Sequence, residues 1–225
     1  MTIGIIAAMS KEVALLRPLL SNPVESEHDS FTFHCGTIGA HRVIVMQCGI
    51  AKVNAAIGTV AMIDNSRPNL IINSGVAGGA DKSVRVMDIV VGAQVAYHDV
   101  YCGPECEKGA VQGFPLYYQG AKSIIDRIEE RDDIKKGLIC TGDQFIDTIE
   151  QLEVIKNFFP QVLAVDMESA AIAQVCELRH VPFLSFRVIS DSPGASPNNT
   201  AEYTNFWETA PKHTFEVLRN LLLTL

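Results

Sequence analysis

Three carboxylates and one arginine lie at the ends of apolar runs, where parallel strands would end. Glu12 follows the first run, Glu168 and Asp191 follow later ones, and Arg187 lies in the last. Ligands of open α/β sheets lie beyond the carboxyl ends of the strands, so we expect these side chains to meet at one edge. The set holds no cysteine–histidine pair and no Ser-His-Asp combination. It is suited to acid and hydrogen-bond chemistry on a polyol. The strand-end segments are residues 9–12, 73–79, 142–146, 166–168 and 187–191.

Each of these residues also has an ordinary structural explanation. Glu12 near the start of a helix is favoured by the helix macrodipole, and Asp191 before Ser-Pro is a common turn or cap residue. Gly75, Gly78 and Gly79 lack the spacing of the known phosphate and dinucleotide loops. The residues support a functional hypothesis as a set, and none of them supports one alone.

The elements that would position these side chains alternate between strands and helices. We expect a glycine-rich turn at 74–79, loops at 99–120 and 192–199, and one long closing helix at 203–223. This alternation predicts an α/β fold in which helices flank a mixed, mostly parallel twisted sheet, in a single domain over residues 1–225. The expected strands are 2–7, 31–36, 42–47, 70–73, 87–91 with 94–96, 136–141, 162–165 and 182–189, and the other expected helices are 10–20, 52–63, 121–130, 149–158 and 167–177.

Composition excludes several classes of protein. A chain of 225 residues with 48% hydrophobic and 20% charged residues is not disordered, and a net charge of −8 disfavours a nucleic acid partner. No apolar run reaches the roughly 18 residues of a membrane span, and the N-terminal run lacks the features of a signal peptide. We therefore expect a cytoplasmic protein without a membrane partner. Its six scattered cysteines indicate reduced thiols rather than a metal site.

Six segments follow one another in the order and spacing of a known family. They include DMESAA at 166–171, RVISD at 187–191 and the early Glu12. In this combination the chain resembles the bacterial 5′-methylthioadenosine/S-adenosylhomocysteine nucleosidases over nearly its whole length. The resemblance implies a fold of the purine nucleoside phosphorylase type and hydrolysis of the N-glycosidic bond between adenine and a 5′-thio-substituted ribose. The six segments are 4–9 with Glu12, 48–53, 72–79, 141–146, 165–173 and 187–191.

The resemblance assigns the reaction to four residues. Asp191 would be the general acid toward adenine N7, which requires a pKa raised by burial. Glu12 would orient and deprotonate the attacking water, and Arg187 would help to hold that water. Glu168 would bind the ribose hydroxyls and favour positive charge on the sugar ring. Ser190, the neighbour of Asp191 in the chain, would belong to the substrate-binding site.

The resemblance also assigns the walls of the pocket. Phe145 would stack on adenine, the backbone of Ile146 would read its Watson–Crick edge, and Met167 would lie against the ribose. Met9 and Ile50 would line the space for the 5′-alkylthio group.

The same family closes its pocket with an aromatic residue and a loop of the neighbouring subunit. Tyr203, with Phe206 as the alternative, and Pro115 are the candidates here, and a homodimer is implied. No cofactor is expected.

Two positions depart from the family pattern. Val76 stands where the family usually has Ser, which removes a hydroxyl near the water or the sugar. Asp166 stands where it usually has Glu, so we expect a ribose contact there to be lost or bridged by water. The loop 99–120 matches poorly, which leaves the preference among methylthio, homocysteinyl and plain 5′-deoxy substituents open.

Two other functions are alternatives. A phosphorylase of the same fold would transfer the sugar to phosphate, although the carboxylate of Glu12 would repel phosphate in a dry pocket. A non-catalytic module that binds a nucleoside is favoured only by Val76 and Asp166.

Overall fold

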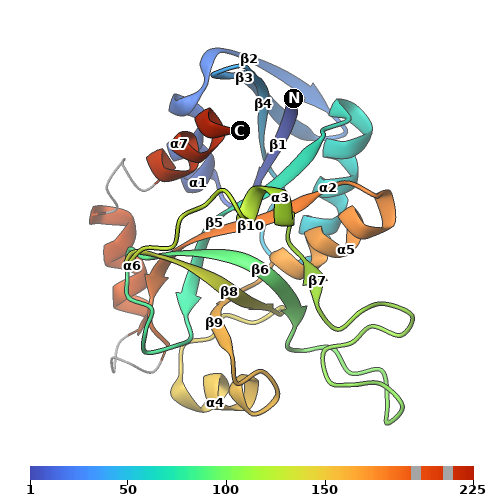
Figure 1. The fold of residues 1–225 in the computed structure, drawn as a ribbon, viewed down its shortest axis with the longest axis vertical. Helices are drawn as coiled ribbons and strands as arrows, with labels where there is room; N and C mark the ends of the chain where they lie inside the picture. The colour runs from blue at the N-terminus through green and yellow to red at the C-terminus, as the bar shows by residue number, and fades with distance from the viewer. Residues whose placement is uncertain (194–198, 210–214) are drawn as a thin grey trace.

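One mixed β-sheet runs through the protein, with helices on its outer faces (Figure 1). The computed structural model describes residues 1–193, 199–209 and 215–225. The expected α/β fold with a mixed sheet is confirmed. The strands are β1 (Thr2–Ala7), β2 (Ser21–His28), β3 (Phe31–Ile38), β4 (His41–Gln47), β5 (Leu70–Gly79), β6 (Ile89–Tyr97), β7 (Tyr118–Gln119), β8 (Ile134–Thr141), β9 (Val162–Asp166) and β10 (Phe183–Asp191).

Strand pairing closes part of this sheet on itself. β5 pairs with β10, β10 with β6, β6 with β8, β8 with β9, and β9 with β5 again. On its other side β5 is followed by β1, β4, β3 and β2. The strands β4, β1, β5 and β10 run parallel to one another, so the carboxyl ends of β1, β5 and β10 reach the same edge of the sheet.

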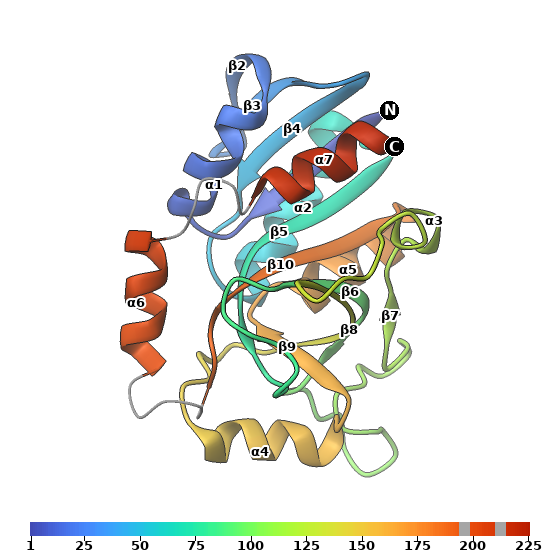
Figure 2. The ribbon, with the colours of Figure 1, turned by 60° about the vertical axis from the view of Figure 1, so that its left-hand side comes forward.

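Helices cover both faces of the inner strands (Figure 2). Side chains of α2 and α5 share one buried cluster with the sheet, and side chains of α1 and α7 share another. No helix among the described residues is long and apolar enough to cross a membrane. The helices are α1 (Ser10–Leu16), the 3₁₀ turn η1 (Arg17–Leu19), α2 (Lys52–Ser66), α3 (Lys122–Ile125), α4 (Ile149–Phe158), α5 (Ser169–Arg179), α6 (Asn199–Thr209) and α7 (Glu216–Thr224).

The first strand shows why its residues form a continuous apolar run. Ile3 and Ile5 pack into the cluster that contains α1 and α7, whereas Ile6 packs into the cluster that contains α2 and α5. Gly4 faces the cluster that contains α2 and α5, where an added Cβ would lie 2.9 Å from Met62 Cγ. A strand that is buried on both faces needs apolar or small residues at every position.

Several elements of the structure differ from the sequence-based expectation, and the short strand β7 lies within the expected loop 99–120. The strand β2 was not expected because all of its residues are exposed, so no apolar alternation marks it. The expected helix 121–130 is reduced to the four residues of α3. In place of the single expected helix 203–223 the structure has two helices, α6 and α7, which lie apart in Figure 2. Residues 210–214 lie outside the described residues. Residues 194–198 of the expected loop 192–199 also lie outside them.

Candidate active site

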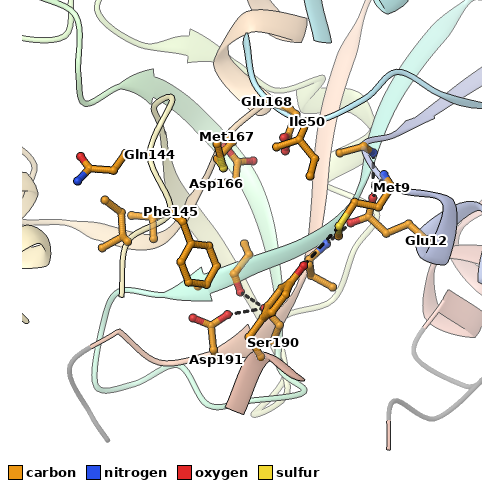
Figure 3. A pocket seen from close by; sticks show the side chains of 17 residues that line it. Met9, Glu12, Ile50, Gln144, Phe145, Asp166, Met167, Glu168, Ser190 and Asp191 are labelled. Carbon is orange, nitrogen blue, oxygen red and sulfur yellow. Dashed lines mark hydrogen bonds between the residues drawn. The ribbon is translucent and has the colours of Figure 1, made fainter. Parts of the chain in front are cut away.

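A pocket of about 690 Å³, its open mouth included, lies at the carboxyl ends of β1, β5, β9 and β10. Figure 3 shows Glu12, Glu168 and Asp191 on different sides of it. Segments that are far apart in the sequence therefore meet here, as expected. The sequence-predicted site residues that line the pocket are Met9, Glu12, Ile50, Val76, Phe145, Ile146, Asp166, Met167, Glu168, Ser190, Asp191 and Tyr203.

The carboxylate of Glu12 is held by backbone N–H groups. Its Oε2 atom accepts hydrogen bonds from the amides of Ala8 (2.8 Å) and Met9 (2.9 Å), and its Oε1 atom accepts one from Val76 (2.9 Å). The side chain is 1% exposed. Burial raises the pKa of Glu12, while Arg187 and the three N–H groups oppose that rise. Three donors hold the ionised form, and burial makes that form a stronger base.

The glycines of β5 allow this close approach. A Cβ on Gly75 would lie 2.3 Å from Glu12 Oε1 and 2.6 Å from Arg187 Nη1, so only glycine fits between them. The expected glycine-rich turn at 74–79 is wrong, because β5 continues to Gly79. The glycines serve close packing inside a strand and not chain reversal. Val76 contributes its backbone N–H to Glu12, so the serine-to-valine departure leaves this bond intact.

Arg187 lies fully buried behind the pocket and is not one of its lining residues. Its Nε and Nη2 atoms lie 2.8 and 2.7 Å from Asp166 Oδ2, and Nη2 lies 3.1 Å from Glu168 Oε2. Its Nη1 atom has no hydrogen-bond partner among the described residues. Nη1 and Glu12 Oε1 both border the Cβ position of Gly75. The guanidinium therefore lies near Glu12 as well as in contact with the carboxylates of Asp166 and Glu168.

Asp166 anchors that guanidinium. Its carboxylate also accepts hydrogen bonds from Thr141 Oγ1 (2.6 Å) and from the hydroxyl of Ser169. Its oxygens are thus occupied by protein partners, although its side chain borders the pocket. This arrangement gives Asp166 a function that does not depend on a ribose contact.

Glu168 is 5% exposed and lies between a backbone amide and the guanidinium. Its Oε1 atom accepts a hydrogen bond from the amide of Ala51 (3.0 Å), and its Oε2 atom accepts one from Arg187 (3.1 Å). Burial raises the pKa of Glu168 to about 7, with Asp166 and Glu12 adding to the rise and Arg187 opposing it. Ala51 reaches Glu168 with φ 80° and ψ 166°, a backbone conformation that strongly favours glycine.

Asp191 is held by side chains. Ser190 Oγ donates to its Oδ1 atom (2.5 Å), and Asn199 Nδ2 donates to its Oδ2 atom (2.8 Å). The residue is 2% exposed, and burial raises the pKa of Asp191 while both donors oppose that rise. A carboxyl group in this setting can keep a proton toward neutral pH. Sequence reasoning missed Asn199, although asparagine is a preferred residue at the start of a helix.

Aromatic side chains form the outer wall. The rings of Phe145 and Tyr203 meet edge to face with centroids 5.5 Å apart, and the Tyr203 hydroxyl lies 3.4 Å from Met9 Sδ. Phe145 is 43% exposed and therefore offers an open ring face. Phe206, the alternative to Tyr203, is buried in the core. Pro115 is exposed and its expected contact with a neighbouring subunit stays a prediction.

The pocket has no metal-binding arrangement. No group of histidine, cysteine, aspartate and glutamate side chains among the described residues is placed to hold a metal ion.

The fold and the carboxylate-lined pocket define a member of the phosphorylase superfamily, whose sequence model matches residues 2–223. The chain is 37% identical to the 5′-methylthioadenosine/S-adenosylhomocysteine nucleosidase of Anoxybacillus flavithermus, over 97% of each chain. It is 41% identical to the enzyme of that name from an Exiguobacterium species, over 93% of this chain and 92% of the relative. The nucleosidase of S. pneumoniae, solved with the transition-state inhibitor MT-ImmA, superimposes with a TM-score of 0.93 at 34% identity, over 99% of each chain. The chain belongs to this family of nucleosidases.

Proposed function

We propose that this protein hydrolyses the N-glycosidic bond of 5′-methylthioadenosine and S-adenosylhomocysteine, with water as the acceptor. The products are adenine and the 5′-substituted ribose. The observation that carries the proposal is the placement of two buried carboxyl groups, Glu12 and Asp191, in one pocket with different hydrogen-bond partners. The nucleosidase family to which the chain belongs supports it.

Asp191 is the general acid in this mechanism. Its raised pKa lets it hold a proton that passes to adenine N7 as the bond from C1′ to N9 breaks. Phe145 and Ile146 bound the side of the pocket where adenine would lie. Adenine then leaves as a neutral molecule and not as an anion.

Glu12 is the general base. It removes a proton from the water that attacks C1′, and Arg187 stabilises the carboxylate before the transfer. Glu168 lies in the pocket beside Met167, where it can accept hydrogen bonds from the ribose hydroxyls and favour the positive charge that develops on the ring.

The charges of the pocket disfavour the phosphorylase alternative. Glu12, Asp166, Glu168 and Asp191 line it, and no lysine, arginine or histidine of the described residues is among its lining residues. The nearest buried cation, Arg187, already contacts two carboxylates. A phosphate dianion would therefore meet like charges in a poorly solvated space.

We further propose that the protein is a homodimer. The helix α2 carries the exposed apolar side chains Val53 (68%) and Ile57 (55%), and Ile50 at the pocket is 47% exposed. A partner subunit that covers this face would enclose the 5′ substituent. Sedimentation at two protein concentrations tests the assembly.

A cytoplasmic location is also part of the proposal. All six cysteines are free thiols, which fits a reducing compartment. The acidic net charge of −8 supports the absence of a nucleic acid partner.

The first experiment measures adenine release from 5′-methylthioadenosine in phosphate-free buffer and again with millimolar phosphate. S-adenosylhomocysteine and 5′-deoxyadenosine are run alongside, and the Glu12→Gln variant controls for contaminating nucleosidases. Equal release in both buffers with a free sugar product is expected. Release only with phosphate would establish a phosphorylase, and tight binding without release would establish a binding module.

A further inference from the structure

Asn199 is a buried polar residue that does not line the pocket and yet contacts the acid. It is the first residue of α6 and is 3% exposed. Its Nδ2 atom donates to Asp191 Oδ2 (2.8 Å), while its Oδ1 atom has no hydrogen-bond partner among the described residues. Burying an amide with one unpaired atom costs free energy. The unpaired Oδ1 atom offsets part of the stability that the Nδ2 hydrogen bond provides, so fold stability alone does not account for this placement.

Asn199 also lies on the side of α6 that packs against the rest of the protein. Asn199, Tyr203 and Trp207 are spaced four residues apart and so lie on the same side of the helix. Tyr203 contacts Met9 and Phe145, and Trp207 lies under the ammonium of Lys11 at 5.4 Å from its ring centroid. The helix thus sits against the segment that carries Glu12, and this seating fixes where the Asn199 amide points.

We propose that Asn199 is a positioning residue for the general acid, through a hydrogen bond that strengthens as Asp191 gives up its proton. The inference rests on the proposed function. Ser190 holds Oδ1 and Asn199 holds Oδ2, so the two donors fix the plane of the carboxyl group. When the proton moves from Asp191 to adenine N7, the carboxyl becomes a carboxylate, and an N–H donor binds a carboxylate more strongly than an acid. A contact that is stronger in the transition state raises kcat.

The surroundings of Asp191 define the pH readout. Among the described residues, the titratable side chains that face it are Glu202 and Tyr203, both from α6. The opposite strand β5 presents Ala77 and Gly78, which do not titrate. Glu202 accepts a hydrogen bond from the Ser192 amide (3.1 Å) and is unchanged in the variants below.

The test compares Asn199→Asp and Asn199→Ala with the wild type in adenine release from 5′-methylthioadenosine between pH 5 and 9. Asn199→Ala removes the donor without adding a charge. Asn199→Asp keeps the shape of the side chain and suits a helix N-terminus because of the macrodipole, and it places a second carboxyl group beside Asp191. We expect kcat to fall about 10- to 100-fold in both variants with little change in KM. The alkaline limb of the kcat profile should move to higher pH in Asn199→Ala, because the ionised form of Asp191 has lost a stabilising partner, and further in Asn199→Asp, because the second carboxylate also repels that ionised form.

The controls separate this role from a structural one. Thr204→Ala alters the exposed side of the same helix and should retain wild-type kcat, and thermal unfolding checks that each variant folds. Wild-type kcat and an unshifted pH profile in Asn199→Ala would overturn the inference. If the wild type itself released no adenine, the proposed function would fail first, so the two failures are distinguishable.

Discussion

Glu12 and Asp191 line the same pocket, but the chain holds them by different means. Three backbone N–H groups bind Glu12, whereas a hydroxyl and a side-chain amide bind Asp191. A backbone N–H can only donate, so it favours the carboxylate alone. Hydroxyl and amide groups can turn to donate or to accept. The donors around Glu12 therefore favour only its ionised form, whereas the groups around Asp191 can serve both of its protonation states.

The largest effect is expected when the backbone-held group is changed. In Glu12→Gln the new amide group would face at least one backbone N–H, so one of the three bonds is lost and the base is removed. We expect kcat to fall about 10⁴-fold, at the upper end of what a general base contributes, together with a lower melting temperature. Adenine release and thermal unfolding measure both, and calorimetry should still detect ligand binding. Turnover like that of the wild type would sink the role of Glu12 as base.

Asp191→Asn is expected to cost roughly 10²- to 10³-fold in kcat, because the donated proton is lost. Its melting temperature should stay near that of the wild type, since Ser190 and Asn199 can reorient toward the new amide. The measurement is the same pair of assays. A melting temperature as low as that of Glu12→Gln would contradict the distinction between the two groups.

Glu168 accepts hydrogen bonds from a backbone amide and from a side chain. The pH dependence of its contribution to stability therefore extends the comparison. Its pKa, raised to about 7 by burial, means that the folded state binds the proton more tightly than the unfolded state does. The stability that Glu168 contributes is complete below its ordinary pKa and is lost as pH rises through about 7. In the wild type the free energy of unfolding should fall between pH 5 and pH 8. In Glu168→Gln, which has no carboxyl group to titrate, this decrease should be smaller by about 2 kcal/mol. Urea denaturation at the two pH values measures this free energy, and an equal change between pH 5 and pH 8 in the wild type and the variant would argue against a raised pKa.

The smallest effect concerns the backbone that reaches Glu168. Ala51→Gly should stabilise the protein by about 1 kcal/mol, because glycine adopts the conformation of Ala51 without strain. The amide of residue 51 is retained, so kcat should not change. Ala56→Gly inside α2 is the matched control, with an expected loss of about 1 kcal/mol. Urea denaturation measures both, and an equal loss in the two variants would show that Ala51 is unstrained.

The residues that line the pocket could be predicted from the sequence, but the residues that hold them in place could not. Glu12, Glu168 and Asp191 follow apolar strands, and the ends of such strands meet at one edge whatever the loops do. The sequence pattern predicts a turn at Gly75, because a sequence does not show which side chains pack against a glycine. Asn199 was missed because its partner comes from another element, and local spacing carries no information about such a contact.

The three amides that bind Glu12 have a consequence for spectroscopy. The backbone N–H groups of Ala8, Met9 and Val76 point at one carboxylate, so their proton resonances should shift together when that carboxylate gains or loses charge. Val76 belongs to β5 and the other two to the segment after β1. Two distant stretches of chain thereby form a built-in indicator of the charge on the base, readable by nuclear magnetic resonance without altering a residue.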